Sequence, residues 1–113
     1  MLDMTAMSLN WLVTNIPGSD IQNGQTIAEY QPPAPWDSYK PSQYVAVALL
    51  QAGVINRSSL EKYEARLCEY EPRTRFDLKH FMANFGLEMI VAANYFVVNR
   101  DTYVESIESY CRP

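Results

Sequence analysis

Short stretches rich in apolar, β-branched and aromatic residues predict four β-strands. The first covers residues 9–16, where Trp, Val, Thr and Ile suit a pleated surface, and it ends at a Pro-Gly turn signal at 17–18. Both of its faces are mainly apolar, so we expect a strand that is covered on both sides. Further strands are predicted at 25–30, at 43–51, which we expect to be buried, and at 90–98.

Between the third and fourth strands the spacing of apolar residues becomes helical. Ser58 and Glu61 have the spacing of a capping box, which predicts a helix with Leu60, Tyr63 and Leu67 on one face. A second helix is predicted from residue 77, with an Asp at its start, a Gly stop at 86 and a stripe made of Leu78, Phe81, Met82 and Phe85.

A short C-terminal helix is predicted after Asp101 or Thr102. The order is then strand, strand, strand, helix, helix, strand, helix. It predicts a chain that is mainly β with short helices, in the α+β class.

A proline-rich loop separates the second and third predicted strands. Residues 31–41 contain four prolines together with Trp36 and Tyr39, and prolines at this density do not belong to a central strand. The two aromatic side chains either pack the loop onto the body of the protein or form a binding surface, since long ordered loops often carry function. Packing is the more common of the two roles.

The length and charge of the chain exclude several classes of protein. Its 113 residues predict a single domain spanning 1–113. The net charge of −4 and the pI near 4.8 argue against a nucleic-acid binder, which needs a basic face. No apolar run approaches the roughly 20 residues of a membrane span. No signal peptide is visible, which favours the cytoplasm; a secreted or mitochondrial location would require a missing upstream targeting segment.

The residues that usually carry catalysis or bind metals are few. Cys68 and Cys111 are the two cysteines and His80 is the one histidine. The cysteines form either one disulfide in an oxidising compartment or two free thiols, and we favour free thiols. His80 lies off the apolar stripe of its helix, so we expect it to be exposed. We therefore predict a non-enzymatic chain with no cofactor and no metal site.

The order of segments over residues 9–104 resembles the phosphatidylethanolamine-binding protein family, also called the Raf kinase inhibitor protein family. The resemblance begins with residues 11–21, followed by Gly24 and Glu29-Tyr30, and continues in the loop 35–41 that leads into Tyr44-Val45. Residues 76–104 follow the family's C-terminal pattern at Phe76, Phe81, Leu87, Val91, Ala92, Asn94, Asp101, Tyr103 and Val104.

The resemblance implies an antiparallel sheet flanked by a smaller sheet, with a C-terminal helix and a small anion pocket. In the family this pocket holds phosphate, a phospholipid head group or a phosphorylated side chain. Its two histidines fall on Asn10 and Ser42, and Tyr44 keeps the family's residue, whereas Gln43 replaces an arginine. Trp36 stands where the pocket loop has a proline. The family's upstream aspartate motif has no counterpart in residues 1–8, so the chain resembles the last two thirds of the domain.

These departures predict a degenerate pocket. Asn10, Trp36, Ser42 and Tyr44 are the candidate ligand-binding residues, and they offer only neutral hydrogen bonds to a phosphate or phospholipid head group, which they would bind weakly. We expect a non-catalytic binding or regulatory module, with a protein partner as a further option. The alternative is a structural or interaction domain of a larger assembly, such as the large subunit of the mitochondrial ribosome.

Overall fold

The computed structural model describes residues 7–32 and 42–98, and these form a mainly β structure with short helices, which confirms the predicted α+β class. The strands are β1 Leu12–Thr14, β2 Gln25–Ala28, β3 Ser42–Leu49 and β4 Ile90–Val98. The α-helix α1 covers Leu78–Asn84, and the 3-10 helices are η1 Ile21–Asn23, η2 Arg57–Tyr63 and η3 Glu71–Arg73. The C-terminal helix predicted after Asp101 or Thr102 lies outside the described residues.

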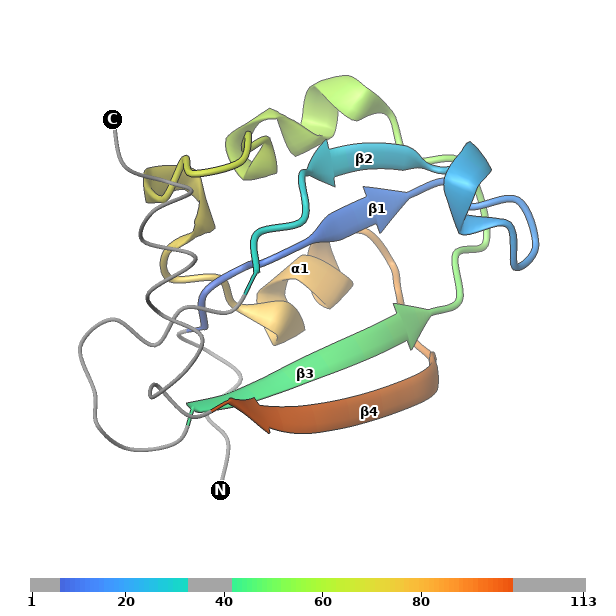
Figure 1. Ribbon diagram of the computed structural model, residues 1–113. Helices are drawn as coiled ribbons and strands as arrows, with labels where there is room; N and C mark the ends of the chain where they lie inside the picture. The colour runs from blue at the N-terminus through green and yellow to red at the C-terminus, as the bar shows by residue number, and fades with distance from the viewer. Residues whose placement is uncertain (1–6, 33–41, 99–113) are drawn as a thin grey trace.

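The four strands form two separate two-stranded antiparallel sheets. β1 pairs with β2, and β3 pairs with β4 in a longer ribbon. Figure 1 shows the two sheets one above the other, with α1 behind the space between them. The buried core joins β2, η2 and α1 and consists of Leu9, Ile27, Ala28, Ile55, Leu60, Tyr63, Ala65, Phe81 and Leu87.

The first strand is shorter and more exposed than predicted. β1 holds only three residues, because Asn15 takes a left-handed backbone conformation with φ of 55° and ends the extended run. Thr14 is buried and Leu12 and Val13 are half-buried, but Trp11 is exposed. The expectation of a strand covered on both sides is therefore wrong within the described part of the chain.

The strands predicted at 43–51 and 90–98 form β3 and β4, but the prediction that the first of them is buried is wrong. Its residues from 43 to 49 are half-buried or exposed, and β4 is exposed up to its last residue. Several large apolar side chains of β4 lie in solvent, namely Ile90, Val91, Tyr95, Phe96 and Val97. A two-stranded ribbon whose sequence suits the interior of a sheet thus stands at the surface.

The two predicted helix starts have different outcomes. Asp77 caps α1 as expected, because its carboxylate accepts a hydrogen bond from the backbone N–H of His80, and Gly86 follows the helix with φ of 64°. His80 is exposed, also as expected. The capping box at Ser58 is wrong: Asn56 caps the segment by accepting from the N–H of Ser58, and the segment is a 3-10 helix.

The hydroxyl of Thr14 is a buried polar group without a hydrogen-bond partner among the described residues. Thr14 is 5% exposed, and its Oγ1 is bonded to no atom in that part of the chain, which is a net cost to folding. We expect Thr14→Val to raise the free energy of unfolding by about 1 kcal/mol, as measured by urea denaturation. The control is Thr26→Val on the exposed face of β2, which should change little. A Thr14→Val variant less stable than the parent would show that the hydroxyl is satisfied.

Candidate functional site

A buried polar network lies where the chain enters β1 and leaves β2. The side-chain Nδ2 of Asn10 donates to the carbonyl oxygen of Gln31 at 2.9 Å, and the backbone N–H of Gln31 donates to the carbonyl of Asn10 at 2.7 Å. The buried Gln31 side chain accepts from the backbone N–H of Cys68 at 2.7 Å. These bonds join the segment before β1, the segment after β2 and the loop at Cys68, which are far apart in sequence.

Arg73 is the centre of this network. Its side chain is 1% exposed, and its guanidinium donates to four backbone carbonyls: Nε to Glu69 at 2.7 Å, Nη1 to Leu9 at 3.3 Å and to Asn10 at 3.0 Å, and Nη2 to Arg66 at 2.7 Å. The planar fork of arginine suits several oxygens at fixed angles. The side chain thus ties the segment before β1 to the loop between residues 66 and 73.

Burial also affects the charge of Arg73. Desolvation lowers the pKa of its guanidinium below the usual value, while the charges of Glu29 and Glu69 act in the opposite direction. Because an arginine starts from so high a pKa, it stays protonated at ordinary pH. Its positive charge is enclosed by carbonyl oxygens and held away from solvent, so it is not presented to an incoming anion.

An exposed aromatic pair lies next to this network in sequence. Trp11 follows Asn10 and Tyr30 precedes Gln31, and their rings meet edge to face with centroids 5.9 Å apart and planes at 90°. Trp11 is 47% exposed and Tyr30 is 53% exposed. Edge-to-face geometry is a favourable arrangement for two aromatic rings. The pair presents apolar ring faces and a phenol to solvent on a base that is fixed by internal hydrogen bonds.

The structure places the predicted site residues as follows. The amide of Asn10 is bonded to Gln31, and Tyr44 in β3 stacks on Phe96 of β4 with centroids 5.4 Å apart. Ser42 begins β3, and Trp36 lies outside the described residues. Asn10 precedes β1 and Tyr44 lies near the start of β3, two strands that run in the same direction (Figure 1), so the two residues lie at the same end of the molecule.

The sequence pattern did not reveal three members of this region. Tyr30 and Gln31 follow β2 in an irregular stretch and Arg73 ends the short 3-10 helix η3, where apolar periodicity carries no signal. The one available signal is that Tyr30 ends a predicted strand and that Gln31 directly follows it. The arrangement as a whole can bind by ring stacking and apolar contact, because its buried polar groups are already bonded to one another.

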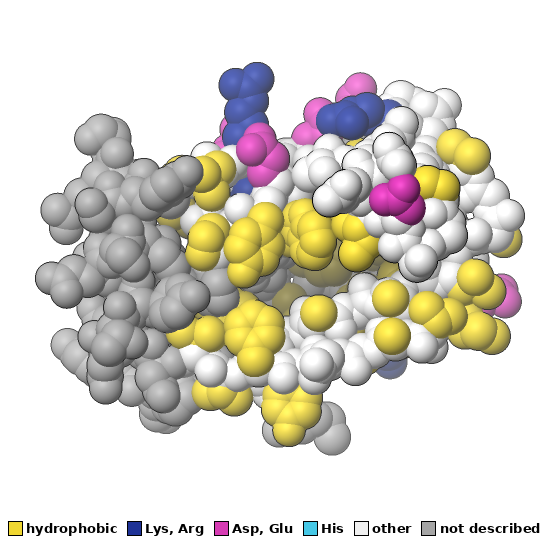
Figure 2. Space-filling model, turned by 45° about the vertical axis from the view of Figure 1, so that its right-hand side comes forward, with side chains coloured by type: hydrophobic (Ala, Val, Ile, Leu, Met, Phe, Trp, Pro, Cys, Tyr) yellow, Lys and Arg dark blue, Asp and Glu magenta, His cyan; other side chains and the backbone are white. Residues whose placement is uncertain are grey.

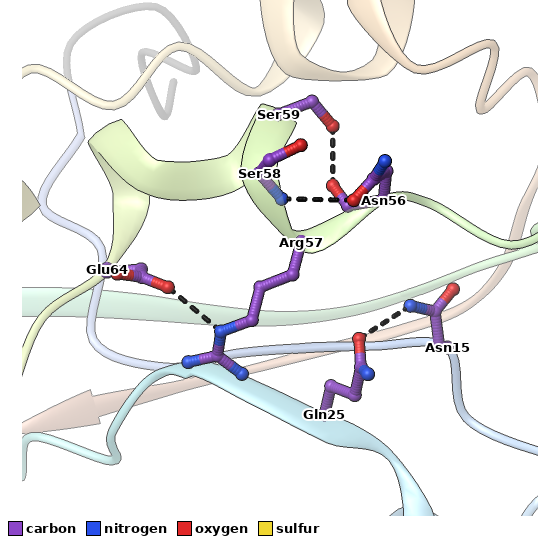
Figure 3. Close-up of polar contacts among 7 residues, drawn as sticks. All are labelled: Asn15, Gln25, Asn56, Arg57, Ser58, Ser59 and Glu64. Carbon is purple, nitrogen blue, oxygen red and sulfur yellow. Dashed lines mark hydrogen bonds and ion pairs between the residues drawn. The ribbon is translucent and has the colours of Figure 1, made fainter.

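At the opposite end of β1, the side chain of Asn15 joins three segments. Its Nδ2 donates to the side chain of Gln25 at 2.8 Å and to the carbonyl of Ile55 at 2.9 Å, and its Oδ1 accepts from the N–H of Ile55 at 2.8 Å. The side chain of Gln51 bonds to the backbone N–H of Asn15 at 3.0 Å and also donates to its Oδ1. Figure 3 shows the contact with Gln25. We call this set of residues the Asn15 clamp.

The Asn15 clamp should contribute measurably to stability. We expect Asn15→Gly, which keeps the left-handed backbone but removes the amide, to lower the free energy of unfolding by about 2 kcal/mol. Asn15→Ala should lose about 1 kcal/mol more, because alanine disfavours positive φ. Urea denaturation measures both. Gln25→Ala removes one exposed contact and is the control; an Asn15→Gly variant no weaker than this control would contradict the role of the clamp.

The expectation of free thiols is wrong for Cys68, which is disulfide-bonded. Cys111, the other cysteine of the sequence, lies outside the described residues. Within residues 7–32 and 42–98 no cluster of three or more His, Cys, Asp or Glu side chains could hold a metal ion. The same residues contain no helix that is long and apolar enough to cross a membrane.

Comparison with known proteins gives three relatives, and no family model matches the chain. It is 29% identical over 99 residues to the Drosophila melanogaster protein named "Putative odorant-binding protein A5", covering 88% of this chain and 46% of the relative. It is 32% identical over 88 residues to the 26 kDa secreted antigen of Toxocara canis, covering 78% and 32%. It is 33% identical over 103 residues to Protein BROTHER of FT and TFL 1 of Arabidopsis thaliana, covering 90% and 52%. The chain spans between about a third and a half of these relatives.

Proposed function

We propose that this chain is part of a non-catalytic binding module of the phosphatidylethanolamine-binding protein family, in which an exposed aromatic pair contacts a small, largely apolar ligand. The observation that carries the proposal is the Trp11–Tyr30 pair, which stands in solvent on a fixed base of buried hydrogen bonds. The similarity to the Arabidopsis protein, a member of that family, supports the family assignment.

The polar groups near the aromatic pair favour an apolar ligand over an anion. The Nδ2 of Asn10 is bonded to a carbonyl, and the charge of Arg73 is enclosed by carbonyls. An anion site needs aligned donors that are free to reach the ligand. Asn10, Trp36, Ser42 and Tyr44 therefore remain, in this proposal, a degenerate pocket that holds a phosphate or phospholipid head group weakly. The odorant-binding name of the Drosophila relative also supports a small ligand.

The disulfide at Cys68 bears on where the module works. Disulfides persist in oxidising compartments and are rare in the cytosol, so we infer a secreted or otherwise oxidising location in place of the cytoplasm. The name of the Toxocara relative, a secreted antigen, supports this inference. The relatives are two to three times longer than the matched region. What a whole protein of that length does, and what it binds, is therefore likewise proposed and not established by the similarity.

An NMR titration tests the proposal. The folded chain is titrated with 2-phenylethanol, a small aromatic alcohol, and in separate samples with sodium phosphate and phosphoethanolamine. We expect saturable shifts at Trp11 and Tyr30 with the alcohol, and much weaker responses near Asn10 and Tyr44 with the anions. Trp11→Leu should abolish the alcohol response.

Tyr95→Leu is the matched control, because it removes an exposed aromatic ring of β4 that is not part of the pair. This variant should keep the alcohol response. Strong binding of phosphate at Asn10 and Tyr44, or no response to the alcohol at Trp11 in a folded sample, would overturn the proposed ligand class. Nothing among the described contacts or the relatives favours the alternative of a domain in the mitochondrial ribosome, and we do not propose it.

A further inference from the structure

The start of η2 contains an acceptor sequence for N-linked glycosylation. Asn56, Arg57 and Ser58 follow the pattern Asn-x-Ser, in which the middle residue is not proline. A transferase of the secretory pathway requires this pattern to attach an oligosaccharide to asparagine. No other asparagine in the sequence is followed, two residues later, by serine or threonine. Asn56 is therefore the only acceptor of this kind in the 113 residues.

A three-residue pattern also arises by chance, so its position in the fold matters. Asn56, Arg57 and Ser58 are all exposed, and Figure 3 shows them at the start of η2. The surface around them is hydrophilic: Figure 2 shows Lys, Arg, Asp and Glu side chains gathered at the top of the molecule, where Figure 1 places η2. An oligosaccharide is bulky and hydrophilic and needs a surface position of this kind.

The hydrogen bonds of Asn56 do not involve the atom that would react. Its side-chain Oδ1 accepts from the backbone N–H of Ser58 at 3.3 Å, and its backbone carbonyl accepts from Oγ of Ser59 at 2.6 Å. A sugar attaches to the other side-chain atom, the amide nitrogen Nδ2. A glycosylated asparagine keeps its Oδ1, so the side chain can carry a sugar and still cap η2.

A second, independent observation concerns the compartment. Cys68 is disulfide-bonded, and disulfides form and persist in oxidising compartments such as the lumen of the endoplasmic reticulum. Asparagine receives its oligosaccharide in the same compartment, which is why the pattern has meaning in a secreted protein. The accessible acceptor and the disulfide thus indicate one and the same route through the cell.

We propose that Asn56 is an N-glycosylation site, which receives an oligosaccharide from a lipid-diphosphate donor as the chain enters the secretory pathway. The Nδ2 of Asn56 forms a bond to the anomeric carbon of the first sugar, and the bond from that carbon to the diphosphate oxygen breaks. The lipid diphosphate leaves with the electron pair, and Nδ2 passes one proton to a base of the transferase. This site rests on the oxidising location proposed above and is separate from the ligand proposed for Trp11 and Tyr30.

The oligosaccharide would begin at the end of β1 that is remote from the aromatic pair. Ile55, the residue before Asn56, is held by the side chain of Asn15 through hydrogen bonds of 2.9 and 2.8 Å. Asn15 directly follows β1, whereas Trp11 directly precedes it. Val54, two positions before the acceptor, is 88% exposed. A sugar at Asn56 therefore shields this apolar side chain from other molecules.

Mass spectrometry of the protein purified from its own source tests the inference. One sample reports on two residues, because the peptide that contains Asn56 carries or lacks an oligosaccharide, and alkylation before reduction shows whether the thiol of Cys68 is free. We expect an oligosaccharide that peptide N-glycosidase removes, together with a disulfide at Cys68. A disulfide at Cys68 with an unmodified Asn56 would overturn the site but not the location. A free thiol with an unmodified Asn56 would overturn both.

Matched serine variants identify the acceptor sequence. The complete chain is produced in eukaryotic cells behind a cleavable secretion leader, and lysate and medium are analysed together, so that a variant that folds poorly is still counted. The parent should show a single gel shift that peptide N-glycosidase reverses. Ser58→Ala removes the hydroxyl of the pattern but keeps the amide of Asn56, and it should abolish the shift.

Two further variants are the controls. Ser59→Ala changes the neighbouring exposed serine and leaves the pattern intact, so the shift should persist. Ser58→Thr keeps a hydroxyl at the third position and should show the shift as well. A shift that survives Ser58→Ala, or a parent chain that shows none, would overturn the inference.

Discussion

Replacing Arg73 with methionine is expected to lower the free energy of unfolding by about 3–5 kcal/mol, the largest effect of any single substitution considered for this chain. Methionine fills similar volume but donates no hydrogen bond. Two of the four carbonyls keep a backbone donor, since Asn10 accepts from Gln31 and Arg66 accepts from Glu69. The loss falls on the carbonyls of Leu9, which is buried, and of Glu69, because both would lose their bonds to the guanidinium at about 1–3 kcal/mol each.

Urea denaturation measures this effect, and Arg57→Met is its control. Arg57 forms an ion pair in which its Nε lies 2.9 Å from Oε1 of Glu64 (Figure 3), but both side chains are substantially exposed. Pairs of this kind contribute about 1 kcal/mol or less. Arg73→Lys should be nearly as harmful as Arg73→Met, because an ammonium cannot reach carbonyls on two segments at once. If the Arg73 and Arg57 variants lost equal amounts of unfolding free energy, the buried network would not be a major source of stability.

Cys68→Ser is expected to lower the free energy of unfolding by about 3 kcal/mol. Residue 68 has a left-handed backbone with φ of 67°, and serine fits this conformation as well as cysteine does. Its backbone N–H can still donate to Gln31. The substitution therefore isolates the covalent bond from the local geometry, and urea denaturation under non-reducing conditions measures the difference.

Cys111→Ser gives the matched comparison, because Cys111 is the only other cysteine in the sequence. If the two form one bond, each single variant and the double variant should be equally destabilised, and a reducing agent should bring the parent chain to the same stability. Losses that add in the double variant would show that the cysteines act independently.

The sequence predicts those elements that depend on neighbouring residues. The cap of α1 at Asp77 and its end at Gly86 are set within one turn of the helix, and the long apolar runs of β3 and β4 have a clear local signal. The same local reasoning favours Ser58 as the cap. In the structure Asn56, two residues earlier, is the cap, because its side chain accepts a hydrogen bond from the backbone N–H of Ser58. Local rules could not rank two adequate caps in one turn.

Long-range contacts explain what the sequence did not predict. The end of β1 is fixed by Asn15, whose partners Gln51 and Ile55 lie 36 and 40 residues away. Arg73 reaches Leu9 across 64 residues, and no pattern of apolar spacing marks such a contact. The exposure of β4 was likewise hidden, because its composition predicts burial and only the arrangement of strands shows what surrounds it. The sequence pattern places Trp11 in a covered strand and therefore gives no indication of the exposed aromatic pair.

The uncharged ribbon of β3 and β4 has a consequence for handling the protein. Its own residues offer no electrostatic repulsion between molecules, so colloidal stability depends on charges carried elsewhere along the chain. As the pH approaches the pI near 4.8, that repulsion vanishes and the exposed apolar side chains of β4 can associate between molecules. Light scattering across a pH series should therefore show particle growth that is centred on this pH and is suppressed by Tyr95→Lys on the ribbon.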